Sequence, residues 1–149
     1  EAPDSRGALW DERYAGEILM FNNPRDAVGV AQCYLGQSIN TESVEDWDKA
    51  IKALKEQNHL VSSYVMDEVF NKMENGEAAL APYYAGDFLT MYDVNPDLAF
   101  VYPKEGVNFF VDAMCVPKNA ENKEAAELYI NFMLEEEIAV ANANYICYA

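Results

Sequence analysis

Residues 16–36, GEILMFNNPRDAVGVAQCYLG, hold the pattern that decides the fold class of this chain. The run from Gly16 to Phe21 is short, mostly apolar and bounded by Gly and Asn, which is typical of a buried β-strand. Asn23 follows at a preferred N-cap position, and Pro24 suits a first helical turn. Apolar residues then repeat at helical spacing as far as Gly36, which stands where helices commonly end. The stretch therefore predicts a strand followed at once by a helix.

The same alternation continues along the chain. Further strands are expected at residues 60–65, 78–84, 98–102 and 108–116. Further helices are expected from residue 41 to 55, around 69–73 and 88–92, and at 121–135 and 136–143. Because strands alternate with helices throughout, the sequence predicts the α/β class.

The size and net charge of the chain limit the classes of molecule that it is expected to bind. The chain has 149 residues, of which 51% are hydrophobic, so it can bury the core of one domain or a large piece of one. Its net charge of −16 disfavours nucleic acid and anionic membranes, whose binding depends on Lys and Arg. Such a field attracts a cationic ligand, and the alternative is that the acids are simply solvated surface. The first residues lack the basic head and apolar stretch of a signal peptide, so we expect a fragment whose export signal is missing.

No catalytic or metal-binding motif is present in the sequence. The GxSxG, P-loop, GxGxxG and HExxH patterns are all missing. Cys33, Cys115 and Cys147 show no CxxC spacing and no nearby histidine, so we interpret them as small apolar core residues. The sequence predicts neither an enzyme nor a cofactor, although a carboxylate-dependent hydrolase leaves little trace and stays a less favoured alternative.

Asp112 is unusual because it interrupts an apolar run, FFVDAMCV at residues 109–116. An isolated carboxylate is strongly unfavourable in an apolar interior, so Asp112 needs a partner or must face a cleft. One interpretation is a carboxylate bonded to backbone amides or pointing to solvent from an edge strand. The other is a charge that receives a cationic ligand.

Asn23 and Asp26 form a second candidate pair, three residues apart at the start of the expected helix. Capping and the helix dipole explain both residue types without any ligand. They can also line a ligand crevice, because such crevices open at the carboxyl ends of strands. Two aromatic pairs next to expected turns, Tyr83 with Tyr84 and Phe109 with Phe110, are either core residues or faces that hold ammonium groups by cation–π contact.

Three stretches together resemble the spermidine/putrescine-binding proteins of ABC transporters. They are LWDERYAG at 9–16, PKEG at 103–106 with FFVD at 109–112, and PKNAENKEAA at 117–126. The likeness covers nearly all of residues 8–149. The pattern of the last helix is shared by many solute-binding proteins, whereas the PKEG strand with its Asp is far more specific.

The resemblance implies a lobe like those of type II periplasmic-binding proteins, a mixed sheet flanked by helices, with ligand gripped between two lobes. Residues 1–112 would be the second lobe, 113–141 would return to the first lobe, and 142–149 would begin the return to the second. The protein would lie in the periplasm or on the cell surface, without a cofactor, and present its ligand to a membrane permease.

The resemblance also implies the ligand-binding residues. The family's carboxylate pair at the first helix matches Asn23 and Asp26, so one acid has become an amide. The other matching positions are Tyr84 and Phe110, where the family commonly has Trp, Asp112, and Tyr148, with Tyr145 as an alternative register. The expected ligand is a polyamine, spermidine or putrescine. The alternative is a receptor for another small molecule, such as an amino acid or a sugar.

Overall fold

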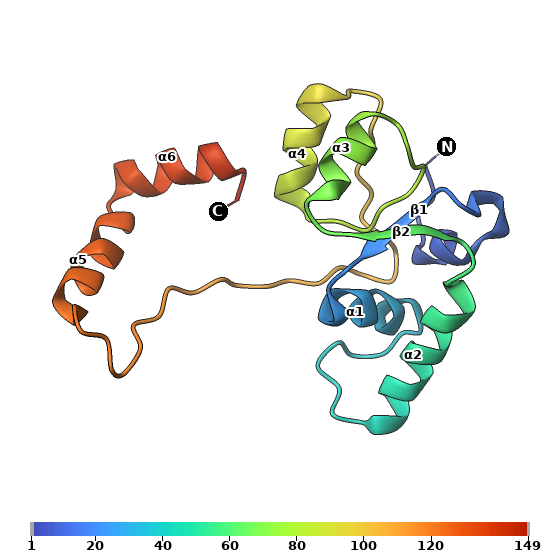
Figure 1. The fold of residues 1–149 in the computed structure, drawn as a ribbon, viewed down its shortest axis with the longest axis horizontal. Coiled ribbons are helices and arrows are strands. Elements are labelled where there is room, and N and C mark those ends of the chain that lie inside the picture. The colour runs from blue at the N-terminus through green and yellow to red at the C-terminus, as the bar shows by residue number, and fades with distance from the viewer. Residues whose placement is uncertain (1, 149) are drawn as a thin grey trace. The chain divides into compact units, whose positions relative to one another are not determined.

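The computed structural model describes residues 2–148, which form two compact units, one ending at Asn108 and one beginning at Phe109. Figure 1 shows the elements along the chain. The first unit contains two 3-10 helices, two strands and four helices: η1 (Arg6–Trp10), η2 (Glu12–Tyr14), β1 (Ile18–Phe21), α1 (Pro24–Tyr34), α2 (Val44–Gln57), β2 (Val61–Val65), α3 (Glu68–Glu74) and α4 (Ala85–Val94). The second unit contains α5 (Lys123–Met133) and α6 (Glu136–Ile146).

Strands β1 and β2 form the centre of the first unit. They pair in parallel, with Ile18 opposite Val61 and Phe21 opposite Val65. Parallel neighbours need a long crossover, which α1 and α2 supply. All four residues of β1 are buried, as expected for a strand covered on both faces. The predicted strands at 16–21 and 60–65 and the α/β class are therefore confirmed.

The first three residues of β1 alternate between two hydrophobic clusters. Ile18 and Met20 pack with residues of α1 and η1, whereas Leu19 packs with β2, α3 and α4. This alternation follows from the two-residue period of a strand. The sheet is thus covered by α1 on one face and by α3 and α4 on the other.

Local sequence signals set the bounds of α1. Asn23 is its N-cap, and its Oδ1 accepts a hydrogen bond of 3.0 Å from the backbone N–H of Arg25. At the other end Gly36 has φ +69°, a left-handed conformation that glycine adopts without steric penalty. The predicted helix between Pro24 and Gly36 is confirmed.

Three of the predicted strands are wrong. Residues 78–84 reduce to a single bridge between Leu80 and Ile18, and residues 98–102 and 108–116 form no strand. A strand needs a neighbour for its backbone N–H and C=O groups, and within residues 2–148 only β1 and β2 pair as strands. Apolar composition alone could not supply that neighbour.

Asp112 is exposed in this structure, so its predicted place inside an apolar strand is also wrong. The reason is the same missing neighbour, since the whole stretch from Phe109 to Cys115 is exposed. Cys115 is therefore no core residue, and Cys33 and Cys147 are only partly buried.

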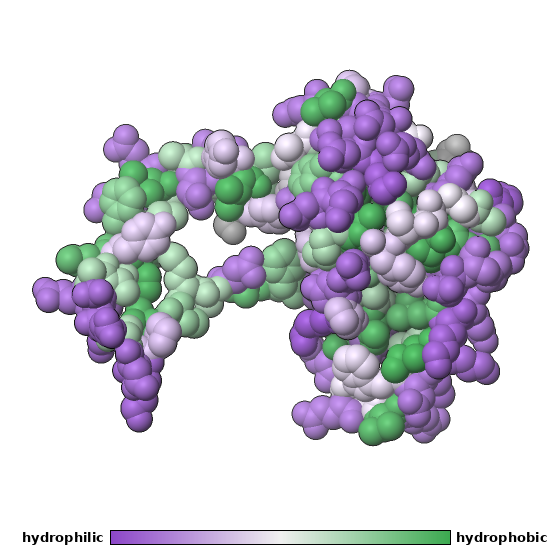
Figure 2. Space-filling view, viewed as in Figure 1, coloured by the Kyte–Doolittle hydropathy of each residue, from purple (hydrophilic) through white to green (hydrophobic). Residues whose placement is uncertain are grey.

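The second unit has helices with largely exposed apolar side chains. In α5, Leu128 is 64% exposed and Tyr129 59%, and neither α5 nor α6 contains a fully buried residue. Figure 2 shows hydrophobic side chains at the molecular surface. The helices predicted at 121–135 and 136–143 are confirmed, the second continuing to Ile146. Across residues 2–148, no helix combines the length and apolar character needed to cross a membrane.

Candidate functional site

The candidate site lies at the carboxyl end of the two parallel strands. Phe21 is the last residue of β1, and the backbone N–H of Asn22 then donates to the carbonyl of Val65, at the end of β2, over 2.9 Å. Helix α1 begins two residues further on, at Pro24. In open α/β sheets, ligands bind at this edge, where strands end and helices begin.

Asp26 is the acidic residue in the first turn of α1 and is half-buried. Its Oδ2 accepts a hydrogen bond of 2.7 Å from the hydroxyl of Tyr84. The structure thus brings together two of the predicted ligand-binding residues that are 58 positions apart in sequence. Asn23 stands at the helix cap, where its side chain satisfies a backbone donor.

Tyr84 is the N-cap residue of α4, so the amino-terminal ends of α1 and α4 meet through the Tyr84–Asp26 hydrogen bond. Burial raises the pKa of Tyr84 well above its usual range, and the hydrogen bond to Asp26 and the Asp26 charge raise it further. The negative charge of Asp87 acts in the same direction. The phenol therefore keeps its proton near neutral pH and donates a hydrogen bond to the carboxylate.

Aromatic rings surround this hydrogen bond. The rings of Phe21 and Tyr84 lie 5.3 Å apart between centroids, and those of Tyr83 and Tyr84 lie 4.9 Å apart. Tyr83 also stacks on Phe21 at 5.5 Å, and Phe70 meets Tyr83 edge-on at 6.2 Å. Such contacts hold the rings in fixed orientations, and aromatic faces attract cations.

Two residues of this region were missed by sequence reasoning. Asp87 lies in the first turn of α4, three residues after the cap residue Tyr84, which repeats the spacing of Asn23 and Asp26. That repeated spacing was the available signal. Phe21 was interpreted only as a strand residue; it is buried at the end of β1, where its ring packs against that of Tyr84 and supports it.

The remaining predicted site residues, Phe110, Asp112 and Tyr148, belong to the second unit. Phe110 and Asp112 are exposed within the extended segment, and Tyr148 follows α6. A grouping of these residues with Asp26 and Tyr84 stays a prediction. Across residues 2–148, no cluster of His, Cys, Asp and Glu suits a metal ion.

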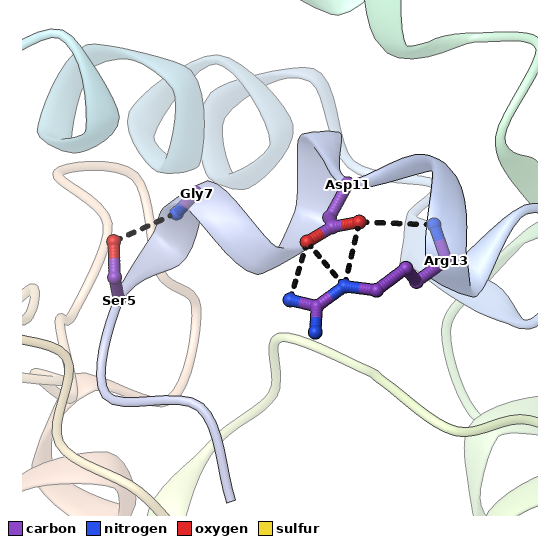
Figure 3. A network of polar contacts seen from close by, with 4 residues as sticks. All are labelled: Ser5, Gly7, Asp11 and Arg13. Carbon is purple, nitrogen blue, oxygen red and sulfur yellow. Dashed lines mark hydrogen bonds and ion pairs between the residues drawn. The ribbon is translucent and has the colours of Figure 1, made fainter.

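The segment LWDERYAG has a structural role in the first unit. The Trp10 ring stacks on Tyr34 at 4.2 Å, and its Nε1–H donates to the carbonyl of Ala53 over 2.9 Å. Figure 3 shows Asp11 capping η2 through the backbone N–H of Arg13 while also pairing with the Arg13 guanidinium. These contacts fix the chain just before β1.

The PKEG turn is held by the N-terminal segment of the chain. The carboxylate of Glu105 accepts hydrogen bonds from the hydroxyl of Ser5 and from the backbone N–H of Arg6. The Arg6 guanidinium donates to the carbonyl of Gly106 over 3.0 Å. Ser5 in turn accepts from the N–H of Gly7 (Figure 3). The turn therefore joins the start of the first unit to its end.

A parallel βαβ core and a carboxylate at its ligand-binding edge, flanked by aromatic faces, define an α/β ligand-binding lobe. Comparison with protein families makes this assignment specific. The family described as bacterial extracellular solute-binding protein matches residues 1–148, and the chain belongs to it.

Individual relatives agree with the family assignment. A spermidine/putrescine-binding periplasmic protein of Escherichia coli is 31% identical over 140 residues, which are 94% of this chain and 40% of that protein. A putrescine/cadaverine-binding protein of Pseudomonas aeruginosa is 24% identical, over 91% of this chain and 40% of its own length.

Solved structures also resemble the chain. A spermidine/putrescine ABC transporter protein of Listeria monocytogenes is 34% identical with a TM-score of 0.91, over 98% of this chain and 45% of that one. A spermidine/putrescine ABC transporter substrate-binding protein of Streptococcus pneumoniae is 30% identical with a TM-score of 0.81, over 100% of this chain and 46% of that one. The expected type of lobe is confirmed, and the chain spans less than half the length of these relatives.

Proposed function

We propose that this chain is part of an extracytoplasmic substrate-binding protein of an ABC transporter and that it binds a polyamine, spermidine or putrescine. The observation that carries the proposal is the half-buried Asp26 carboxylate, held by Tyr84 among aromatic rings at the carboxyl end of the sheet. The identity of 31% to a spermidine/putrescine-binding protein supports the choice of ligand.

The proposed mechanism is binding without covalent chemistry or cofactor. Asp26 accepts hydrogen bonds from one ammonium group, and Asp87 supplies the second negative charge that Asn23 lacks. Tyr84 contacts the aliphatic stem and attracts an ammonium group by about 0.5–2 kcal/mol, while the buried Phe21 ring supports the Tyr84 ring from behind. The net charge of −16 favours approach of a polycation.

Three further residues of the proposed ligand site rest on the family resemblance. Phe110, Asp112 and Tyr148 would meet the ligand when two lobes close, and exclusion of water would strengthen each charge contact. Residues 113–141 would belong to the first lobe, and 1–112 with 142–149 to the second. The exposed apolar side chains of α5 support this division, because such surfaces mark contacts with other protein. The closed form would be presented to a membrane permease.

Calorimetric titration of spermidine and putrescine into the full-length protein tests the proposal. We expect Asp26→Ala and Asp112→Ala each to weaken polyamine binding at least tenfold, about 1.4 kcal/mol, because an ammonium group loses its charged acceptor. Asp48→Ala, which removes an exposed acid from α2, is the matched control and leaves the affinity unchanged.

Three outcomes would contradict the proposal. Equal affinities of the parent and both site variants would remove these residues from the site. Thermal stabilisation by an amino acid or a sugar, but by no amine, would replace the ligand class, since a ligand raises stability by mass action. Turnover of a compound in the same panel would favour the hydrolase alternative.

A further inference from the structure

The hydrogen bond between Tyr84 and Asp26 determines how the carboxylate can receive a ligand. The Tyr84 hydroxyl occupies Oδ2 of Asp26 at 2.7 Å, a short distance typical of a bond to an ionised acceptor. A carboxylate offers two oxygens and can accept further hydrogen bonds. The phenol therefore competes with a ligand for Oδ2 of Asp26 but not for Oδ1.

Neighbouring rings keep the Tyr84 hydroxyl in this position. Phe21 and Tyr83 both lie against the Tyr84 ring, with centroids 5.3 and 4.9 Å away. Rotation of the phenol away from Asp26 would disturb both contacts. Because Tyr84 also begins α4, its backbone is fixed by the helix that follows.

Ammonium and guanidinium groups make different demands on a carboxylate. A primary ammonium is a compact charge that can bind through a single oxygen. A guanidinium is a planar fork whose strongest pairing uses both carboxylate oxygens in parallel. A carboxylate with one oxygen already engaged suits the first group and opposes the second.

We propose that the Tyr84 hydroxyl is a specificity determinant that, by occupying Oδ2 of Asp26, selects ligands with a primary ammonium end over ligands with a guanidinium end. The inference rests on the proposed function, since it assumes that Asp26 receives the cationic end of a linear amine. The added claim is that the hydrogen bond to Oδ2 weakens the binding of guanidinium ligands, so selectivity arises by disfavouring one ligand class.

Two ligands with the same four-carbon chain provide the test: putrescine, with an ammonium at both ends, and 1,4-diguanidinobutane, with a guanidinium at both ends. Because both ends are alike, the orientation of the ligand does not affect the comparison. Calorimetry measures both dissociation constants for the full-length protein, for Tyr84→Phe and for Tyr84→Trp. The two variants keep an aromatic face and remove the hydroxyl.

We expect the parent protein to prefer putrescine at least tenfold, and both variants to reduce that preference at least fivefold. Tyr92→Phe, which removes a hydroxyl from a half-exposed ring elsewhere on α4, is the matched control and leaves the preference unchanged. Thermal unfolding without ligand tests whether each variant is folded. If Tyr84→Phe does not fold, Tyr84→Trp carries the comparison.

Two outcomes overturn the specificity role alone, and a third overturns the proposed function as well. An unchanged preference in a folded Tyr84 variant overturns the specificity role while leaving polyamine binding intact. A parent protein that prefers 1,4-diguanidinobutane also overturns it. If the parent binds neither compound, nor spermidine, the proposed function fails and the specificity role fails with it.

Discussion

Asn23 caps α1 and also stands three residues before Asp26, at a position proposed to contact the ligand. Asp caps a helix about as well as Asn and suits the positive end of the helix dipole. We therefore expect Asn23→Asp to keep the stability of the fold and to tighten spermidine binding severalfold, since a second acid joins Asp26. Calorimetry and chemical denaturation measure the two effects.

Asn23→Ala is the matched control for the capping role. Removal of the cap acceptor leaves the N–H of Arg25 without its partner and lowers the free energy of unfolding by about 1 kcal/mol. An Asn23→Asp protein that binds spermidine no better than the parent would show that Asn23 acts only as a cap.

The PKEG turn connects two distant parts of the first unit through one carboxylate, that of Glu105. Desolvation raises the pKa of Glu105, but the hydrogen bonds from Ser5 and Arg6 outweigh this effect, and the pKa is lowered from its usual 4.5. A lowered pKa in the folded state means that the carboxylate stabilises the fold at pH values above the usual pKa. This contribution is lost as the pH falls through the lowered pKa.

Glu105→Gln tests this pH dependence. At pH 7 the substitution replaces a charged acceptor, and we expect the free energy of unfolding to fall by about 1 kcal/mol, because the site is only partly buried. Below the pKa of folded Glu105 the parent carboxyl is itself neutral, so the difference shrinks. Denaturation at several pH values measures it, and a difference that stays constant from pH 7 to pH 3 would contradict the explanation.

Elements built from local signals could be predicted from sequence, and elements that depend on distant neighbours could not. The bounds of α1 follow from Asn23, Pro24 and Gly36, which act within a few residues of themselves. The stretch 108–116 has a suitable apolar composition but no paired strand within residues 2–148. Composition predicts a strand only where the rest of the fold supplies its partner.

The candidate site also combines residues that local sequence signals indicate with contacts that only the folded structure reveals. Asp26 was a candidate because it follows a strand and a helix cap along the sequence, and Tyr84 because of its aromatic pairing with Tyr83 and the family resemblance. Their mutual hydrogen bond spans 58 positions and appears only when α4 is placed beside α1. The spacing of Asp87 from Tyr84 was visible in the sequence, but its nearness to Asp26 depends on α4 meeting α1.

At the scale of the whole chain, the net charge of −16 predicts that a cationic ligand is attracted over a distance. A field of one sign raises the association rate of an opposite charge and is weakened by salt. The screening length falls from about 30 Å at about 0.01 M salt to about 8 Å at about 0.15 M. The ligand with more positive charges should therefore lose more of its association rate.

Spermidine and putrescine provide the comparison, since spermidine carries one more amine. We expect the association rate of spermidine with the full-length protein to fall more steeply with salt than that of putrescine, while dissociation changes less, because dissociation depends on contacts within the site. Stopped-flow fluorescence at increasing salt measures both rates. Equal slopes for the two amines would mean that the acidic surface does not guide the ligand and that affinity arises from the contacts of Asp26 and its neighbours alone.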